Sequence, residues 1–252
     1  MSLLCKKIYL IIALLAVTAC SQTSVRHHQD YELAANSIET VVIIPADVDM
    51  ELVNFNSDNE QLHEKAALMK AEIHQLASNK LTAENLTVIE FDFDAEIKKD
   101  DEFAYAITQV KEAWHRAKED MYQTGLINEK DKANFQTSLG SVLNSIAEKT
   151  HADAALLMHY SSFEKSAGMI TKDIASSVLV GVLTLGTVIP VQASAGSFVD
   201  IALVETTSGK VIWANRKNTA SADSSPANIA FEELPDLTWK SELINVNNKK
   251  SE

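Results

Sequence analysis

The stretch SFVDIALVETTSGKVIWANR, residues 197–216, decides the fold of this chain of 252 residues. Two runs rich in β-branched and other apolar residues, 197–205 and 210–216, flank the turn sequence Thr206-Thr207-Ser208-Gly209. This composition predicts two antiparallel strands joined by a tight turn. A third apolar run, AALLMHYS at 154–161, predicts another strand upstream of this β-hairpin.

Farther upstream, segments with the periodicity of strands and of helices follow one another. The run TVVIIP at 40–45 predicts a strand buried on both faces, because four consecutive positions are apolar. An acidic, irregular loop is expected from Pro45 to Asn59. The remaining patterns predict a strand at 87–93 and helices at 60–78, 100–121 and 133–149. This order predicts an α/β fold, in which helices pack on a mixed sheet that ends in the antiparallel β-hairpin.

The N-terminus has the pattern of a cleaved secretory signal. Lys6-Lys7 precede the uncharged run 8–17, which is shorter than the roughly 20 apolar residues that a membrane-spanning helix needs. The sequence Val17-Thr18-Ala19-Cys20 that follows resembles a bacterial lipobox. We therefore expect a lipoprotein signal peptide over residues 1–19, cleavage before Cys20 and lipidation of the Cys20 thiol.

Composition excludes some kinds of partner. The formal net charge of −13 becomes −15 when Lys6-Lys7 are removed with the signal peptide. This acidic balance argues against nucleic acid, which needs a basic face, and against charge-driven binding to anionic lipid. The chain has 2 cysteines, of which Cys5 is lost and Cys20 is lipidated, so the mature chain has no disulfide and depends on a packed core.

Changes in composition divide the mature chain into three parts. Residues 20–37 are mostly polar and without apolar periodicity, which predicts a lipidated flexible tether; its His27-His28 pair is interpreted as solvated linker. The α/β domain is expected over 38–220. Residues 221–252 are expected to be a polar C-terminal tail, with a short helical stretch near 231–243.

One apolar insert interrupts the predicted domain before the β-hairpin. Residues 174–191 include no charged side chain, and Ser177 and Gly181 have a spacing that allows close helix contact. Three interpretations stay open: a segment packed on the sheet or on another copy, a membrane-dipping hairpin or strand pair of a shared barrel, and a single transmembrane helix. The residues expected to contact a membrane or a partner are Ile174, Val178, Leu179, Val182, Leu183, Leu185, Val188 and Ile189.

Few residues combine into a pattern that predicts chemistry. Glu90, Asp92 and Asp94 alternate with phenylalanines, which would place three acids on one strand face, either as a calcium or acid–base site or as a solvated surface. Asp153 precedes a strand, where it could line a ligand site but more simply caps a turn. His159 is expected to be a half-buried histidine of the sheet. The chain has no phosphate-binding loop and no zinc-protease spacing, so we expect no catalytic site, no metal and no cofactor.

Trp213, at the end of the β-hairpin, is expected to close the core; an exposed tryptophan there would instead suit an interface.

The last third of the chain carries a resemblance to known proteins. The run Thr150-His151-Ala152-Asp153-Ala154-Ala155-Leu156-Leu157 and the β-hairpin, with its Ser208-Gly209-Lys210-Val211-Ile212-Trp213, resemble a group of bacterial envelope lipoproteins. The group includes lipoproteins of the DUF799 type and, more distantly, the curli secretion lipoprotein and the TolB amino-terminal domain. The similarity covers roughly residues 40–216, and Glu205 stands where the group often has aspartate. It implies an α/β domain that assembles with itself or with an envelope machine, and it implies no catalytic residue.

These observations together predict a function without enzymatic chemistry. We expect an outer-membrane lipoprotein facing the periplasm, anchored by acyl chains such as palmitate, because Ser21 after the lipidated cysteine implies the outer membrane in the Gram-negative lipoproteins that it resembles. It would act as an accessory or assembly subunit of a cell-envelope complex, with a protein partner or as a homo-oligomer. The alternative is an oligomeric secretion-channel subunit that uses the apolar insert in the membrane. A hydrolase or ligand-binding protein using Asp153 is the third hypothesis.

Overall fold

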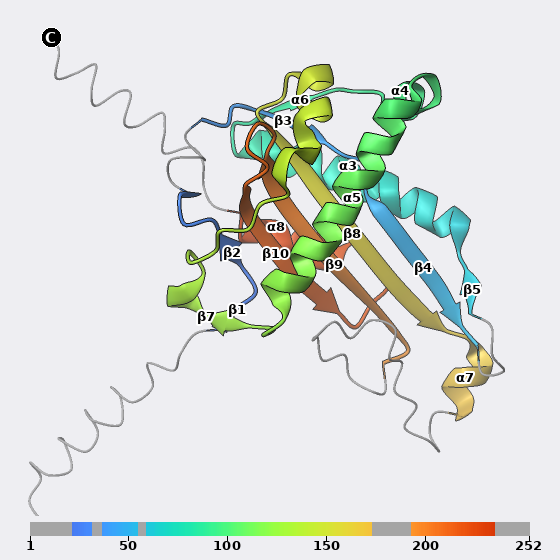
Figure 1. Ribbon diagram of the computed structural model, residues 1–252. Helices are drawn as coiled ribbons and strands as arrows, with labels where there is room; N and C mark the ends of the chain where they lie inside the picture. Colours follow the sequence, from blue (N-terminus) through green and yellow to red (C-terminus); the bar gives the residue numbers. More distant parts are fainter. Residues whose placement is uncertain (1–21, 32–36, 55–58, 173–192, 235–252) are drawn as a thin grey trace, which may run out of the picture.

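The computed structural model describes residues 22–31, 37–54, 59–172 and 193–234, and a mixed sheet forms its centre (Figure 1). The path through this sheet is β2-β10-β9-β8-β3-β6. The long strand β8 (Ala154–Lys165) pairs antiparallel with β9 (Ala195–Glu205), which pairs antiparallel with β10 (Val211–Thr219). On its other side β8 runs parallel to β3 (Thr40–Ile43), which pairs in parallel with β6 (Thr87–Ile89). The predicted α/β fold with an antiparallel β-hairpin is thus confirmed.

The turn of the β-hairpin depends on a glycine. Gly209 has a φ of +68°, a left-handed conformation that favours a residue without a side chain. A Cβ atom at this position would also lie 2.1 Å from the carbonyl oxygen of Gly140. The predicted tight turn is therefore present, and at position 209 its geometry allows only glycine.

The segment expected to be an irregular loop contains a strand. β4 (Asp47–Val53) runs parallel to β8 from Asp47 opposite His159 to Val53 opposite Lys165, and it pairs at its outer edge with the short β5 (Glu60–Gln61). The expectation of a loop was wrong because DVDMELV, although rich in acids, has the period-two alternation of a strand, in which apolar residues occupy every second position.

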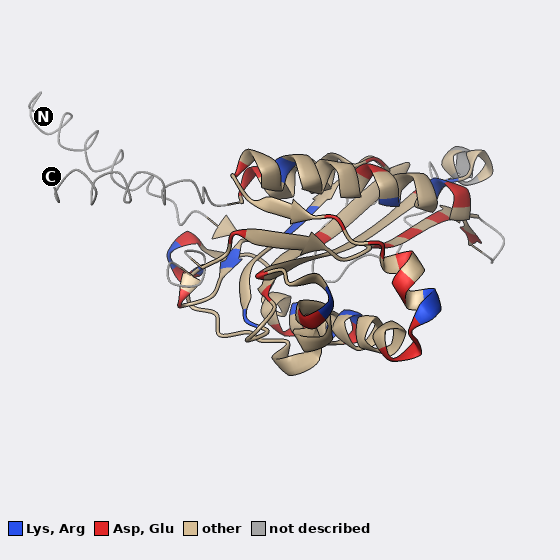
Figure 2. Ribbon diagram, turned by 90° about the horizontal axis from the view of Figure 1, so that it is seen from above, with Lys and Arg blue, Asp and Glu red and all other residues tan. Residues whose placement is uncertain are grey.

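Helices cover both faces of the sheet (Figures 1 and 2). α3 (His63–Ala83) and α8 (Ser225–Glu232) pack on one face, and α5 (Asp101–Tyr122) and α6 (Asn144–Thr150) pack on the other. The shorter α4 (Phe93–Lys99) precedes α5, and α7 (Ala167–Lys172) follows β8. The predicted helices at 60–78 and 100–121 are present with shifted ends.

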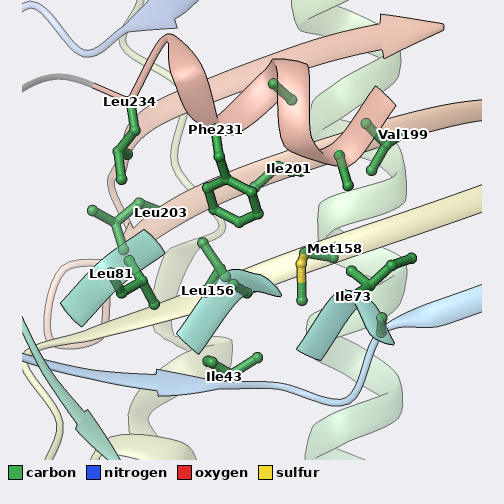
Figure 3. Packing of buried hydrophobic residues seen from close by; sticks show 14 of the residues in the cluster. Ile43, Ile73, Leu81, Leu156, Met158, Val199, Ile201, Leu203, Phe231 and Leu234 are labelled. Atoms are coloured by element: carbon green, nitrogen blue, oxygen red, sulfur yellow. The ribbon is translucent and has the colours of Figure 1, made fainter. Parts of the chain in front are cut away.

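On the α3/α8 face the core consists of interlocking apolar side chains (Figure 3). Ile73 and Leu81 of α3 and Phe231 of α8 meet Leu156 and Met158 of β8 over the middle of the sheet. All five are less than 9% exposed. Trp213 belongs to the same cluster and is fully buried, which confirms it as a core residue.

Two predicted elements are shorter than expected. The strand at 87–93 ends at Ile89, because the Asp92 carboxylate accepts a hydrogen bond from the backbone N–H of Ala95 and caps α4. The acids at 90, 92 and 94 therefore share no strand face. The helix expected at 133–149 is reduced to a 3-10 turn, Gly140–Leu143, and α6, because the preceding residues lie extended and make bridges at Phe135 and Ser138.

The predicted tether is part of the fold. β1 (Gln22–Thr23) pairs antiparallel with β7 (Ile127–Asn128), and β2 (Arg26–His27) pairs with β10. Thr23, Ser24, Val25, Arg26 and His28 are buried. The prediction of a flexible tether over 20–37 was wrong for these residues, because polar side chains, rather than an apolar stripe, fix the segment.

The polar C-terminal tail begins later than expected. Ser225–Glu232 forms α8, whose Phe231 is buried on the sheet, so the domain extends to Leu234 instead of ending at residue 220. The apolar insert and its eight expected contact residues lie outside the described residues, as do Cys20 and residues 235–252. Among the described helices, none combines the length and apolar content needed to cross a bilayer.

Candidate functional site

The α5 face of the sheet contains a buried ionic cluster formed by Asp200, Arg216, Lys118 and His159. Asp200 lies on β9, is fully buried, and pairs with Arg216 of β10 at 2.7 Å from Nε to Oδ1 and 3.2 Å from Nη2 to Oδ2. Lys118 of α5 places Nζ 3.5 Å from Oδ2, and His159 of β8 places Nδ1 3.9 Å from the same oxygen. One carboxylate is thus surrounded by three basic groups.

A β-bulge brings the main pair of this cluster together. The register of β9 with β10 shifts between Val211 and Trp213, so Arg216 rather than Asn215 lies opposite Asp200. Without the shift, Asn215 would lie opposite Asp200, and the alternation of side chains would direct Arg216 to the other face of the sheet. The arginine therefore reaches the aspartate because of one irregular residue near the turn.

The charges of the ionic cluster alter one another's protonation. Burial raises the pKa of the Asp200 carboxyl, but contacts with His159 and Arg216 outweigh it, so the pKa lies below its ordinary value. Burial lowers the pKa of His159, but its carboxylate neighbours Asp200 and Asp49 outweigh this and leave it raised. The pKa of Lys118 is lowered because burial outweighs the attraction of Asp200, and the positive charge of Arg216 lowers it further.

Aromatic stacking joins the ionic cluster to the N-terminal segment. The Arg216 guanidinium lies 4.1 Å from the ring centroid of Tyr122, and that of Arg26 lies 4.7 Å from the same ring. Arg26 Nε also donates to the carbonyl of Met121 at 3.2 Å, and its Nη2 donates to the carbonyl of Gly125. Two buried cations thus share one aromatic ring, which ties residues 22–28 to the C-terminal end of α5.

A polar pocket opens beside the ionic cluster at the edge of the sheet, between the end of β3 and β4. Its volume is about 520 Å³. Its walls come from β4, α3, α5 and β8, and its lining residues are Ala46, Asp47, Val48, Asp49, Ala66, Ala67, Lys70, Lys111, Trp114, His115, Lys118 and His159. A shallower pocket of about 440 Å³, which shares Ala46, Ala67 and Lys70, continues toward Phe91 and Phe93.

The polar pocket combines cations with carboxylates. Lys111 forms an ion pair with Asp47, and His159 Nε2 lies 3.7 Å from Asp49 Oδ2. Trp114 is 4% exposed, and its indole N–H has no hydrogen-bond acceptor within the described part of the chain. The pocket also lies at the carboxyl end of parallel strand β3, where open α/β sheets bind ligands. Such a site can hold a small polar group chiefly through N–H donors.

The sequence-predicted site at Asp153 has a structural role. Its Oδ2 accepts hydrogen bonds from the backbone N–H groups of Glu39 and Thr40, at 3.0 and 2.9 Å, and from the Thr40 hydroxyl at 2.8 Å. These bonds hold the start of β3 beside β8. His151 ends α6 in a left-handed conformation with a φ of +54°. Within the described ranges, no three acidic, histidine or cysteine side chains gather as a metal site.

Sequence reasoning placed His159 correctly in a strand but missed its partners. Asp200 had a visible signal, since an aspartate inside the apolar run FVDIALV needs a buried counterion. Lys118 had a weaker one, because it interrupts the apolar stripe of α5 next to Ala117. Arg26 had none, because the segment around it has no apolar period.

A second region of functional interest is the anchor end, defined as β1, β7 and the residues 124–130 around β7. Gln22 pairs with Asn128 and Thr23 with Ile127, so the first described residues after Cys20 lie on this surface. Leu126, next to β7, is 56% exposed, and Lys130 is also exposed. The anchor end joins the ionic cluster through Arg26.

Comparisons with known proteins gave only distant structural likenesses. A scan of protein-family models and a search of curated proteins found no match. The lipoprotein GNA1162 from Neisseria meningitidis is 11% identical, with a TM-score of 0.31, 83% of this chain and 96% of that chain covered. The LpoB C-terminal domain from Salmonella enterica is 11% identical, with a TM-score of 0.28, 77% of this chain and 95% of that chain covered.

A dodecameric PelC variant from Paraburkholderia phytofirmans is also 11% identical, with a TM-score of 0.32, 86% of this chain and 95% of that chain covered. At this level of similarity, none of the three carries an argument about the function of this chain. Membership of the DUF799 group stays a prediction from the sequence.

Proposed function

We propose that this protein is a bacterial lipoprotein that is cleaved before Cys20, anchored by lipid in the outer membrane and exposed to the periplasm. The observation that carries the proposal is the segment from Lys6-Lys7 through the apolar run 8–17 to Val17-Thr18-Ala19-Cys20. Attachment through more than one acyl chain gives stable anchoring.

The same proposal assigns the protein a non-enzymatic role as an accessory or assembly subunit of a cell-envelope complex. Its prominent acids are occupied within the fold: Asp153 holds β3, and Asp200 pairs with Arg216 and Lys118. The apolar residues of 174–191 would supply the contact with a protein partner or with the membrane.

The anchoring proposal is tested by replacing the cysteine. Cells that express the Cys20→Ser protein should incorporate no labelled palmitate into it, and the protein should leave the membrane fraction. The matched control is Cys5→Ser, which changes the other cysteine of the chain and should leave both labelling and fractionation intact. If the Cys20→Ser protein still takes up palmitate, the assignment of the lipidation site fails.

The alternative function is an oligomeric secretion-channel subunit that uses the apolar insert in the membrane. The uncharged length of residues 174–191 favours it. Crosslinking in intact cells followed by detergent extraction separates the two functions. A ring of many copies would support the channel, whereas a monomer crosslinked to a different protein would support the accessory subunit.

A further inference from the structure

We infer that the folded domain lies directly on the membrane surface, with the anchor end facing the headgroups of a phospholipid bilayer. The inference rests on the proposed lipidation of Cys20 and deepens it by naming the docking surface and its partner. Its basis is the strand β1, which starts at Gln22 where a free tether was expected.

The reach of the chain between lipid and fold is very short. Ser21 is the one residue between Cys20 and Gln22. Even fully extended, the chain spans at most about 7 Å from the Cα atom of Cys20 to that of Gln22. Since the acyl chains on Cys20 insert in the hydrocarbon of the bilayer, β1 is held within a few ångströms of the headgroup region.

The segment behind the lipid cannot easily detach to lengthen this link. Ser24 Oγ donates to Asn215 Oδ1 at 2.7 Å, and the backbone N–H of His28 donates to the carbonyl of Ile212 at 2.9 Å. Arg26 is 1% exposed and holds the carbonyls of Met121 and Gly125. Detachment would expose or leave unpaired every one of these buried polar groups, which is costly.

The chemistry of the anchor end suits a bilayer interface. Leu126, one of the large apolar side chains that the domain exposes, lies beside β7. An exposed leucine can enter the interfacial layer of a bilayer. A domain held in this way meets its partner at the membrane surface rather than at the end of a long tether.

The test uses the full chain, produced with its signal peptide, lipidated and reconstituted into vesicles of phosphatidylethanolamine and phosphatidylglycerol. Because Cys5 is removed and the Cys20 sulfur is alkylated, an engineered cysteine is the single free thiol. A fluorophore on the Lys130→Cys protein reports on the anchor end, and one on the Leu68→Cys protein serves as the control. Leu68 is 73% exposed on α3, and this helix lies away from β1 and β7 (Figure 1).

Lipids that carry a nitroxide quencher should remove most of the fluorescence at position 130 and leave that at position 68 nearly unchanged. A flexible Gly/Ser spacer of about 20 residues inserted between Ser21 and Gln22 has a root-mean-square reach of about 25 Å and should abolish the quenching at position 130.

Equal, weak quenching at positions 130 and 68 in protein that carries palmitate and sediments with vesicles would overturn the docking inference alone. Quenching at position 130 that survives the spacer would equally overturn it, since the short link would then not set the orientation. Absence of palmitate from the unmodified protein would instead refute the proposed function.

Discussion

The two faces of the central sheet are held by different interactions. Under α3 and α8 the packing is apolar, with Ile73 and Phe231 meeting the even-numbered residues of β8. Under α5 the apolar packing is interrupted near the C-terminal end of the helix by the ionic cluster around Asp200. The stability of the apolar face depends on how well its side chains fill the available volume. The stability of this charged end depends on keeping a carboxylate beside the buried cations. Both regions reach the N-terminal segment: Val25 packs in the apolar cluster, and Arg26 stacks on Tyr122 beside the ionic cluster.

The largest effect is expected from removing the single acid of the ionic cluster. Asp200→Ala leaves the buried Arg216 and Lys118 without their carboxylate and should lower the free energy of unfolding by about 4 kcal/mol. Urea unfolding followed by circular dichroism measures this. The control is Asp49→Ala, which removes a carboxylate that is 67% exposed near the same His159 and should cost less than about 1 kcal/mol. Equal losses of unfolding free energy in the two variants would mean that the buried carboxylate of the ionic cluster stabilises the protein no more than an exposed one.

The apolar face should respond to lost volume instead of lost charge. Ile73→Ala opens a cavity under α3 at a fully buried position and should destabilise the protein by about 3 kcal/mol. The same unfolding measurement on Leu68→Ala, an exposed leucine of the same helix, should change stability by less than about 0.5 kcal/mol. A loss below about 1 kcal/mol for Ile73→Ala would show that this face repacks freely.

The histidines of the two regions should give opposite pH dependences. Burial and then Lys132 lower the pKa of His27 to about 4, below its unfolded value of about 6.5, so its contribution is full above pH 6.5 and lost between pH 6.5 and 4. The raised pKa of His159 gives the reverse sign: its contribution is full below about pH 6.5 and lost as pH rises through the folded-state pKa.

Thermal unfolding between pH 4 and 8 should therefore show a stability maximum near pH 6.5. His27→Gln should flatten the acidic side, where about 1–2 kcal/mol is at stake after allowance for solvent screening, and His159→Gln should flatten the alkaline side. A profile that both variants leave unchanged would contradict the assignment of these two groups.

The smallest effect is expected at the rim of the polar pocket. The Lys111 and Asp47 side chains are 31% and 45% exposed, so water already solvates the ion pair between them. Lys111→Ala should lower the free energy of unfolding by about 0.5 kcal/mol. A loss of several kcal/mol in the same urea titration would mean that the pocket rim belongs to the ionic cluster rather than to the solvated surface.

Sequence patterns predicted the parts of the fold that are built on regular hydrophobic spacing. The strand at 154–161, the β-hairpin and the helix at 100–121 all have one apolar face or an apolar run, and all are present. The elements missed were those in which polar residues occupy structural positions. β4 has acids on its exposed face, and β1 and β2 are held by hydrogen bonds and stacking.

The sequence by itself determined the class of fold, the turn at Gly209 and the presence of a predicted lipidation signal at Cys20, because each depends on residues that are neighbours along the chain. The tertiary structure decided the rest. A bulge of one residue set Arg216 opposite Asp200, and α5 brought Lys118 and Tyr122 to the same place. The burial of Arg26, which turns an expected tether into a strand, depends on these distant partners. Local patterns cannot encode such contacts, since the energy of a buried charge is fixed by the groups around it in space.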